Sequence, residues 1–258
     1  MNRTIICSTM VYALGKELGL DGGLEEWQRQ MAEPGTDSLP VVRMLSRVGR
    51  FAANPPPSFV PRSFAPASLA PPLEVGVHVD IASTYIARSR SRAFHAAKGA
   101  DFWFACDDDV EASQGTVASL FEAADVPTPR VVFLPCYLRG RSVVGVKFAT
   151  GARVRGMVAP VAPIDWAATC CFVANRAALQ LLDRTCQHLK YLDDDGVHRL
   201  ALFFEMLDQG RWLTEDYSFC VRAGLAGVEL VALMTGLSRH AEQPLQIEQL
   251  LHAPELNQ

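Results

Sequence analysis

The chain has 258 residues, of which 49% are hydrophobic and 20% charged, so it carries enough apolar material for a buried core. Its formal net charge of −4 argues against nucleic acid as a partner, because nucleic-acid binding needs a basic surface. No apolar run approaches the roughly 20 residues that span a bilayer, and we expect no transmembrane segment.

The cysteine pattern indicates free thiols. There are seven cysteines, an odd number, and no CxxC pair, which argues against a disulfide scaffold and against a structural zinc site. Most of them lie in apolar stretches, as buried thiols do. The first residues form a short apolar run broken by polar residues, which predicts a first strand rather than a secretory signal. Together these features predict a cytoplasmic protein.

The first half of the chain alternates between predicted strands and helices. Residues 4–8 are short, apolar and β-branched, which is typical of a buried strand. Two helix-prone stretches, 24–32 and 41–48, precede a segment with seven prolines, 54–72, which predicts a loop, lid or linker. The pattern continues with a strand at 73–80, a helix capped by Ser83 or Thr84 and ending near Lys98, a strand at 102–106, a helix at 114–124 and a strand at 130–134.

The second half is more mixed. Predicted strands cover 143–148, 157–161 and 228–233, and predicted helices cover 177–189, 200–207 and, capped by Thr214, 215–223. The alternation of strand and helix predicts βαβ units. We therefore expect one α/β domain over residues 1–258, with three α/β/α layers, a mainly parallel sheet with antiparallel additions, and a proline-rich insertion at about 50–72.

Three adjacent aspartates, Asp107, Asp108 and Asp109, follow the strand at 102–106. In an open α/β sheet, ligands bind at the carboxyl ends of the strands. Adjacent carboxylates repel one another unless a cation or solvent neutralises them. A divalent ion held between carboxylate and diphosphate oxygens is one explanation, and a solvated acidic turn is the other.

A second triplet, Asp193-Asp194-Asp195, follows a predicted helix and precedes Gly196. This context predicts a surface turn, and we assign it no chemistry.

Three further residues, two acidic and one histidine, are candidates for chemistry. Thr214 caps a predicted helix, which places Glu215 and Asp216 in its first turn, where the helix dipole favours negative charge. These carboxylates either stabilise that helix or serve as a general base toward a hydroxyl. His240, past the last predicted strand, is either a surface residue or a ligand that completes a metal site.

The helix at 83–98 carries an arginine on its apolar face. At 100° per residue, Arg90 projects from the side that holds Ala93 and Phe94, whereas Arg88 and Arg92 lie opposite. A buried arginine needs a carboxylate or a ligand as its partner. We expect Asp80, at the end of the preceding strand, to be that partner.

Three ordered segments together resemble the GT-A glycosyltransferase superfamily, above all its bacterial inverting branch. They are IARSRSRAFHAAKGADFWFACDDDV, similar to that family's helix, strand and acidic "DxD" motif, LTEDYSFCVRAGLAGVEL, similar to its acidic catalytic motif, and LSRH, similar to the stretch with its metal-binding histidine. The resemblance covers about residues 73–241. It implies an enzyme, a glycosyltransferase of the hexosyltransferase type.

The resemblance also implies roles for individual residues. Asp109 binds Mn²⁺ or Mg²⁺, with Asp107 and His240 as further ligands, and Asp107 and Asp108 face the ribose and diphosphate of a UDP- or GDP-sugar. Asp216 is the base that deprotonates an acceptor hydroxyl on a glycan or small molecule, and Glu215 orients the acceptor or a loop. The nucleoside is contacted by Asp80, Arg90 and Ser8 or Thr9, and the donor and acceptor sites are shaped by residues 165–169, including Trp166.

The sequence departs from the family pattern in three places, which leaves donor preference open. Roughly sixty residues separate the first two strands where the family has a short helix, Ser91 stands where asparagine is frequent, and residues 167–171 replace a glycine-rich turn. Two other classes stay open: a nucleotidyltransferase, disfavoured because residues 6–10 contain no glycine for a phosphate loop, and a non-catalytic nucleotide-sugar-binding protein. A retaining transferase is a third alternative.

Overall fold

The computed structural model describes residues 3–11, 74–81, 85–107, 110–112, 114–136, 145–149, 160–235, 237–240 and 243–246. The predicted helices at 24–32 and 41–48, the proline-rich segment, and Asp108 and Asp109 lie outside these ranges. For Thr9, Asp80 and His240 the structure describes the backbone only.

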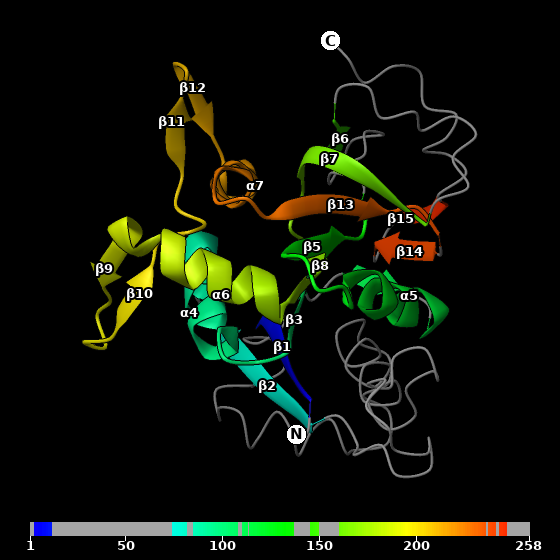
Figure 1. The fold of residues 1–258 in the computed structure, drawn as a ribbon, viewed down its shortest axis with the longest axis horizontal. Helices are drawn as coiled ribbons and strands as arrows, with labels where there is room; N and C mark the ends of the chain where they lie inside the picture. The colour runs from blue at the N-terminus through cyan, green and yellow to red at the C-terminus, as the bar shows by residue number, and fades with distance from the viewer. Residues whose placement is uncertain are drawn as a thin grey trace.

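An eight-stranded mixed sheet forms the centre of the described chain (Figure 1). In spatial order its strands are β2 (Glu74–Ile81), β1 (Thr4–Val11), β3 (Phe102–Asp107), β8 (Cys171–Asn175), β5 (Arg130–Phe133), β13 (Glu229–Leu233), β7 (Val161–Ala167) and β6 (Val146–Phe148). All run in one direction except β8 and β7, which are reversed. The sheet is therefore mostly parallel in strand direction, although β8 separates β3 from β5 with antiparallel pairs on both sides.

Helices flank this sheet. They are α4 (Ile86–Ala97), α5 (Gln114–Ala124), α6 (Arg176–Thr185) and α7 (Glu215–Leu225). Side chains along β3 alternate between two apolar clusters, as successive residues of a strand must. Trp103 packs with residues of α4, α6 and α7, whereas Phe102 and Phe104 pack with residues of α5.

Three smaller β structures complete the described chain. They are the hairpin of β9 (Lys190–Leu192) and β10 (His198–Leu200), the hairpin of β11 (Met206–Asp208) and β12 (Arg211–Leu213), and a sheet of β4 (Val110–Ala112), β14 (Leu237–His240) and β15 (Gln243–Gln246). A short 3₁₀ helix, Gln187–Leu189, links α6 to β9. The β11–β12 hairpin stands clear of the central sheet and leads directly into α7 (Figure 1).

Most predicted elements are confirmed, and the predicted helix at 200–207 is wrong. Residue 200 ends β10, and Met206 begins β11. Tertiary contacts take the place of the hydrogen bonds that a helix would form in this segment. Nη1 of Arg222 donates to the carbonyl oxygens of Leu202 (2.9 Å) and Phe204. The Phe203 ring stacks on Phe219, with centroids 4.4 Å apart. Because long-range packing satisfies this backbone, its helix propensity does not decide its structure.

Strand β8 was not predicted, although its apolar residues fill the middle of the sheet. The predicted helix at 177–189 is shorter than expected, since α6 ends at Thr185. The residue that separates strand from helix is Asn175. Its Oδ1 accepts from the backbone N–H of Ala178 (2.9 Å), and its Nδ2 donates to the carbonyls of Ala124, Val126 and Thr128.

One of the two predicted N-caps is confirmed. Tyr85, not Ser83 or Thr84, is the N-cap of α4, and its side chain makes no capping hydrogen bond. Thr214 is the N-cap of α7, as predicted, but the bond at this position comes from its backbone, whose carbonyl accepts from Ser218 N (2.9 Å). Neither helix therefore depends on a side-chain cap.

The prediction of free thiols is confirmed. All seven cysteines are unpaired, and all are buried except Cys170, which is half-buried. Burial raises the pKa of the Cys7 thiol to about 12. Within the described ranges, no helix combines the length and apolar character needed to cross a membrane.

Candidate functional site

Arg90 joins carboxylates from two distant parts of the chain. Its Nη1 lies 2.5 Å from Oδ1 of Asp216 and 3.8 Å from Oε1 of Glu215, and its Nη2 lies 3.4 Å from both carboxylate oxygens of Asp107. The side chain is only 7% exposed. The sequence prediction of a buried arginine with carboxylate partners is confirmed. The side chain of Asp80, the partner that the sequence predicts, lies outside what the structure describes.

The surroundings of Arg90 keep it charged. Its guanidinium carbon lies 5.8 Å from the centroid of Phe203, whose ring face attracts a cation. Burial alone lowers the pKa of Arg90, but the charges of Asp216, Asp107 and Glu215 more than offset it, and the net pKa is raised. Among these four side chains, three carboxylates face one guanidinium, which leaves an excess of negative charge.

Asp107 occupies the carboxyl end of β3. Its backbone N–H donates to the carbonyl of Cys170 (2.8 Å), which ties the strand end to the turn between β7 and β8. In the register of the parallel strands, Asp107 and Asp80 both pair with Met10, one on each side of β1, and Thr9 pairs with Cys106. The backbones of Thr9, Asp80 and Asp107 therefore share one edge of the sheet.

Thr169 is a site residue whose role the sequence did not reveal. It is 1% exposed, lies in the turn before β8, and its Oγ1 donates a short hydrogen bond to Oδ1 of Asp216. Sequence reasoning placed residues 165–169 near the donor and acceptor sites but had no signal for this contact. Asp216 is thus held from two directions, by Arg90 from α4 and by Thr169.

Glu215 lies beside Asp216 in the first turn of α7 and is 22% exposed. Burial and the charge of Asp216 raise its pKa, while Arg90 lowers it, and the net pKa is raised above the ordinary value of 4.5. The fold therefore favours the protonated form of this carboxyl more than water does.

His240 belongs to a strand, contrary to the prediction that it lies past the last one. In β14 it pairs with Val110 of β4, the residue that follows Asp109 in the chain. Directly opposed residues of an antiparallel pair have Cα atoms about 4.5 to 5.5 Å apart. The backbone of His240 therefore lies next to that of Val110. Asp108, Asp109 and the His240 side chain fall outside what the structure describes.

Ser8 and Trp166 have structural partners. The hydroxyl of Ser8 is buried and accepts a 2.7 Å hydrogen bond from Nε1 of Trp103. The Trp166 ring packs against Tyr217, with centroids 4.2 Å apart. Tyr217 directly follows Asp216, so this aromatic pair lies close to the candidate site.

The second aspartate triplet forms the predicted turn, with Gly196 at a φ of 77°, but Asp193 itself is buried. Oxygens of Asp193, Asp194 and Asp195 come within 4.8 Å of one another, close enough to hold a divalent cation. Three arginines, Arg88, Arg92 and Arg199, contact the same carboxylates. They neutralise the charge that would attract a cation.

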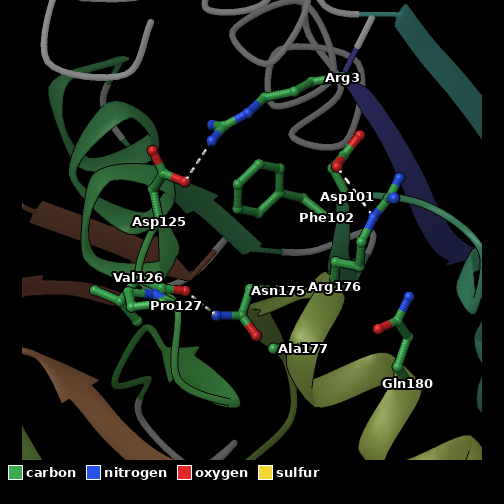
Figure 2. A pocket seen from close by; sticks show the side chains of 10 residues that line it. All are labelled: Arg3, Asp101, Phe102, Asp125, Val126, Pro127, Asn175, Arg176, Ala177 and Gln180. Carbon is green, nitrogen blue, oxygen red and sulfur yellow. Dashed lines mark hydrogen bonds and ion pairs between the residues drawn. The ribbon is translucent and has the colours of Figure 1, made fainter. Parts of the chain in front are cut away.

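A cavity of about 250 Å³ opens at the opposite edge of the sheet (Figure 2). It lies where β1 and β3 begin, and ion pairs flank it: Arg3 with Asp125 (3.0 Å) and Arg176 with Asp101 (3.1 Å). Since β3 separates it from Asp107, this cavity is not part of the candidate site.

The sequence comparisons found no match, and the two solved structures described below are distantly similar to this chain. No family model and no curated protein matches the sequence. The structure titled "Crystal Structure of A197 from STIV" is 13% identical with a TM-score of 0.43, and the match covers 92% of this chain and 85% of that one. The structure titled "Crystal structure of S. aureus TarS 1-349" is 15% identical with a TM-score of 0.38, and the match covers 90% of this chain and 58% of that one.

Proposed function

We propose that this protein is a metal-dependent glycosyltransferase of the three-layer GT-A type, formed by a single domain and acting in the cytoplasm. It would move a sugar from a nucleotide-diphosphate sugar to an acceptor hydroxyl by inverting direct displacement. The observation that carries the proposal is the contact of Arg90 with both Asp107 and Asp216. It brings the two acidic motifs of the family pattern, 109 residues apart, to one guanidinium.

The charges fit a divalent cation at this edge of the sheet. Asp107, Glu215 and Asp216 outnumber Arg90, and Asp108 and Asp109 follow directly in the chain. Carboxylate oxygens are the ligands that Mg²⁺ and Mn²⁺ prefer. Asp109, Asp107 and His240 would hold the ion. When bound, such an ion stabilises negative charge on the departing diphosphate.

The protein's own residues would then position and deprotonate the acceptor. Both described contacts of Asp216 use Oδ1, one from Arg90 and one from Thr169, and this fixes the carboxylate orientation. Oδ2 takes part in neither contact, and it is the oxygen that would accept the acceptor proton. Asp80, Thr9 and Asp108 would contact the nucleotide, since Thr9 and Asp80 lie at the same sheet edge as Asp107.

A donor screen tests the proposal. The purified chain is mixed with UDP-, GDP- and dTDP-sugars, with and without Mn²⁺, and melting temperature and release of nucleoside diphosphate are measured. We expect one donor to raise the melting temperature only with Mn²⁺ and to be turned over. Pyrophosphate release would instead identify a nucleotidyltransferase, and nucleotide binding without a metal requirement would identify a non-catalytic binding protein.

A matched pair of variants separates the two aspartate triplets. We expect Asp109→Ala to abolish metal-dependent turnover and Asp195→Asn to leave it unchanged, because Asp195 is 43% exposed and contacts Arg199 of β10. Full metal-dependent turnover by Asp109→Ala would overturn the assignment. Loss of metal dependence in Asp195→Asn alone would indicate that the second triplet holds the ion.

A further inference from the structure

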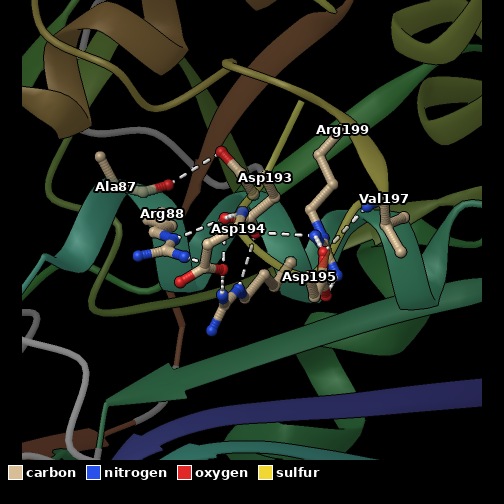
Figure 3. A network of polar contacts seen from close by, with 9 residues as sticks. Ala87, Arg88, Asp193, Asp194, Asp195, Val197 and Arg199 are labelled. Carbon is tan, nitrogen blue, oxygen red and sulfur yellow. Dashed lines mark hydrogen bonds and ion pairs between the residues drawn. The ribbon is translucent and has the colours of Figure 1, made fainter. Parts of the chain in front are cut away.

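The Asp193 carboxylate bridges two arginines on helix α4. Its Oδ1 accepts from Nε of Arg88 (2.7 Å) and its Oδ2 accepts from Nε of Arg92 (2.8 Å). A third arginine, Arg199 of β10, donates to Oδ2 at 2.7 Å. Figure 3 shows this carboxylate with Arg88 on one side and Arg199 on the other. The Asp193 side chain is 2% exposed, so these contacts are shielded from solvent.

The neighbouring aspartates extend the same contacts outward. Asp194 accepts from Nη2 of Arg92 (2.8 Å) and also contacts Arg88, and Asp195 accepts from both Nη atoms of Arg199 (2.6 and 2.5 Å). Together the three arginines and three aspartates join α4 to the turn of the β9–β10 hairpin. Their formal charges balance.

Arg90 lies on the opposite face of α4. Residues 88 and 92 are four apart and share a face of the helix, whereas residue 90 is two positions from each and points away. Two contacts about one helical turn apart fix both the rotation of a helix and its position along its axis. The partners of Arg88 and Arg92, on the other face of α4, therefore help to set the orientation of Arg90.

We infer that Asp193 is a positioning residue: by binding Arg88 and Arg92 together, it fixes α4 so that Arg90 reaches both Asp107 and Asp216. The expected effect of Asp193 on turnover rests on the proposed function, whereas its effect on the placement of Arg90 does not. The second aspartate triplet then supports the candidate site from outside it.

The direct test observes the Arg90 guanidinium by ¹⁵N-resolved NMR, with its signals assigned by their loss in Arg90→Lys. In Asp193→Asn we expect the Arg90 signals to shift. The guanidinium protons of Arg90 should also exchange with water about tenfold faster, because its contacts with the carboxylates open more often. The matched control is Asp195→Asn, which removes a 43% exposed carboxylate that contacts Arg199. It should leave the Arg90 signals unchanged. Unchanged Arg90 signals in folded Asp193→Asn would overturn the inference.

Two milder variants cover the case in which Asp193→Asn does not fold. Arg88→Gln and Arg92→Gln each remove one contact from the helix side and leave the other two arginines on Asp193. Each should change the Arg90 signals in the same direction, by less. If neither does so, Asp193 only anchors the hairpin and the inference fails.

Donor turnover, measured in parallel, separates the inference from the proposed function. If the wild-type chain turns over a donor, we expect kcat of Asp193→Asn to fall about tenfold or more and the same substitution to have no further effect in an Arg90→Lys background. If Arg90 responds but the wild type turns over no donor, the positioning role stands and the proposed function fails. If turnover is normal and Arg90 does not respond, only the inference fails.

Discussion

Arg90 Nη1 lies 2.5 Å from Asp216 Oδ1, although the two residues are 126 positions apart in the chain. The same guanidinium faces Asp107, so one side chain connects the end of β3 with the start of α7. The geometry of the candidate site therefore depends on a guanidinium that contacts different carboxylates through its two Nη atoms.

Replacing Arg90 by lysine tests this dependence. A lysine ammonium cannot face two carboxylates with the fork of a guanidinium, and Asp107 or Asp216 would lose its contact with residue 90. We expect kcat/KM for metal-dependent transfer to fall about 100-fold or more, and the free energy of unfolding to fall by about 3 kcal/mol. Transfer assays and urea denaturation measure both. Lys98→Ala, at the exposed end of the same helix, is the control, and equal activity in the two folded variants would contradict the prediction.

Thr169→Val tests the second contact of Asp216. Valine keeps the shape of threonine but cannot donate a hydrogen bond, so the Asp216 carboxylate loses one of the two contacts that orient it. We expect kcat to fall about tenfold. The control is Thr185→Val, which removes a hydroxyl that donates to the Leu181 carbonyl on the surface of α6. A kcat unchanged in Thr169→Val would show that Arg90 alone orients Asp216.

Glu215→Gln tests the raised pKa of Glu215. Between the unfolded value near 4.5 and the higher folded value, the folded state binds more protons than the unfolded state, so stability from this group is present at low pH and lost as pH rises. Glutamine does not ionise, so the variant does not lose this stability as the pH rises. We expect the variant to melt roughly 2 °C or more above the wild type at pH 7.5 and close to it at pH 4, by scanning calorimetry. A variant that melts lower at pH 7.5 would mean that Arg90 stabilises the Glu215 charge more than burial disfavours it.

Ser8→Ala tests whether Ser8 supports the core rather than the nucleotide. Its hydroxyl is the acceptor for the buried Trp103 N–H, and alanine leaves that donor without it. The expected loss is about 1 to 3 kcal/mol in the free energy of unfolding. In a Trp103→Phe background the same substitution should cost less, because the donor is gone. Weakened nucleotide binding without a loss of stability would contradict the prediction and indicate that Ser8 contacts the nucleotide.

The parts of the fold that were predictable have strong local patterns. The apolar run before Asp107 and the arginine on the apolar face of α4 each follow from hydrophobic periodicity. That one pattern predicted both the end of β3 and a buried guanidinium in need of carboxylates. Which carboxylates meet it depends on how α7 packs against the sheet, and periodicity carries no information about that.

The parts that were missed depend on long-range contacts. Arg222 satisfies carbonyls that a helix at 200–207 would otherwise have paired within itself. Asp193 was predicted to lie in a surface turn, because the arginines that bury it come from residues 88 and 92 on a different element. In both cases an arginine far away in the sequence decides the local structure.

The reversed strand β8 has a consequence for the order in which this protein can assemble. Among the described strands it alone pairs with both β3 and β5, so until residues 171–175 leave the ribosome those two strands have facing edges with unpaired backbone groups. A nascent chain that has reached residue 136 therefore cannot close the middle of its own sheet. Synthesis of the next forty residues is the interval in which these edges are open to pairing with other chains.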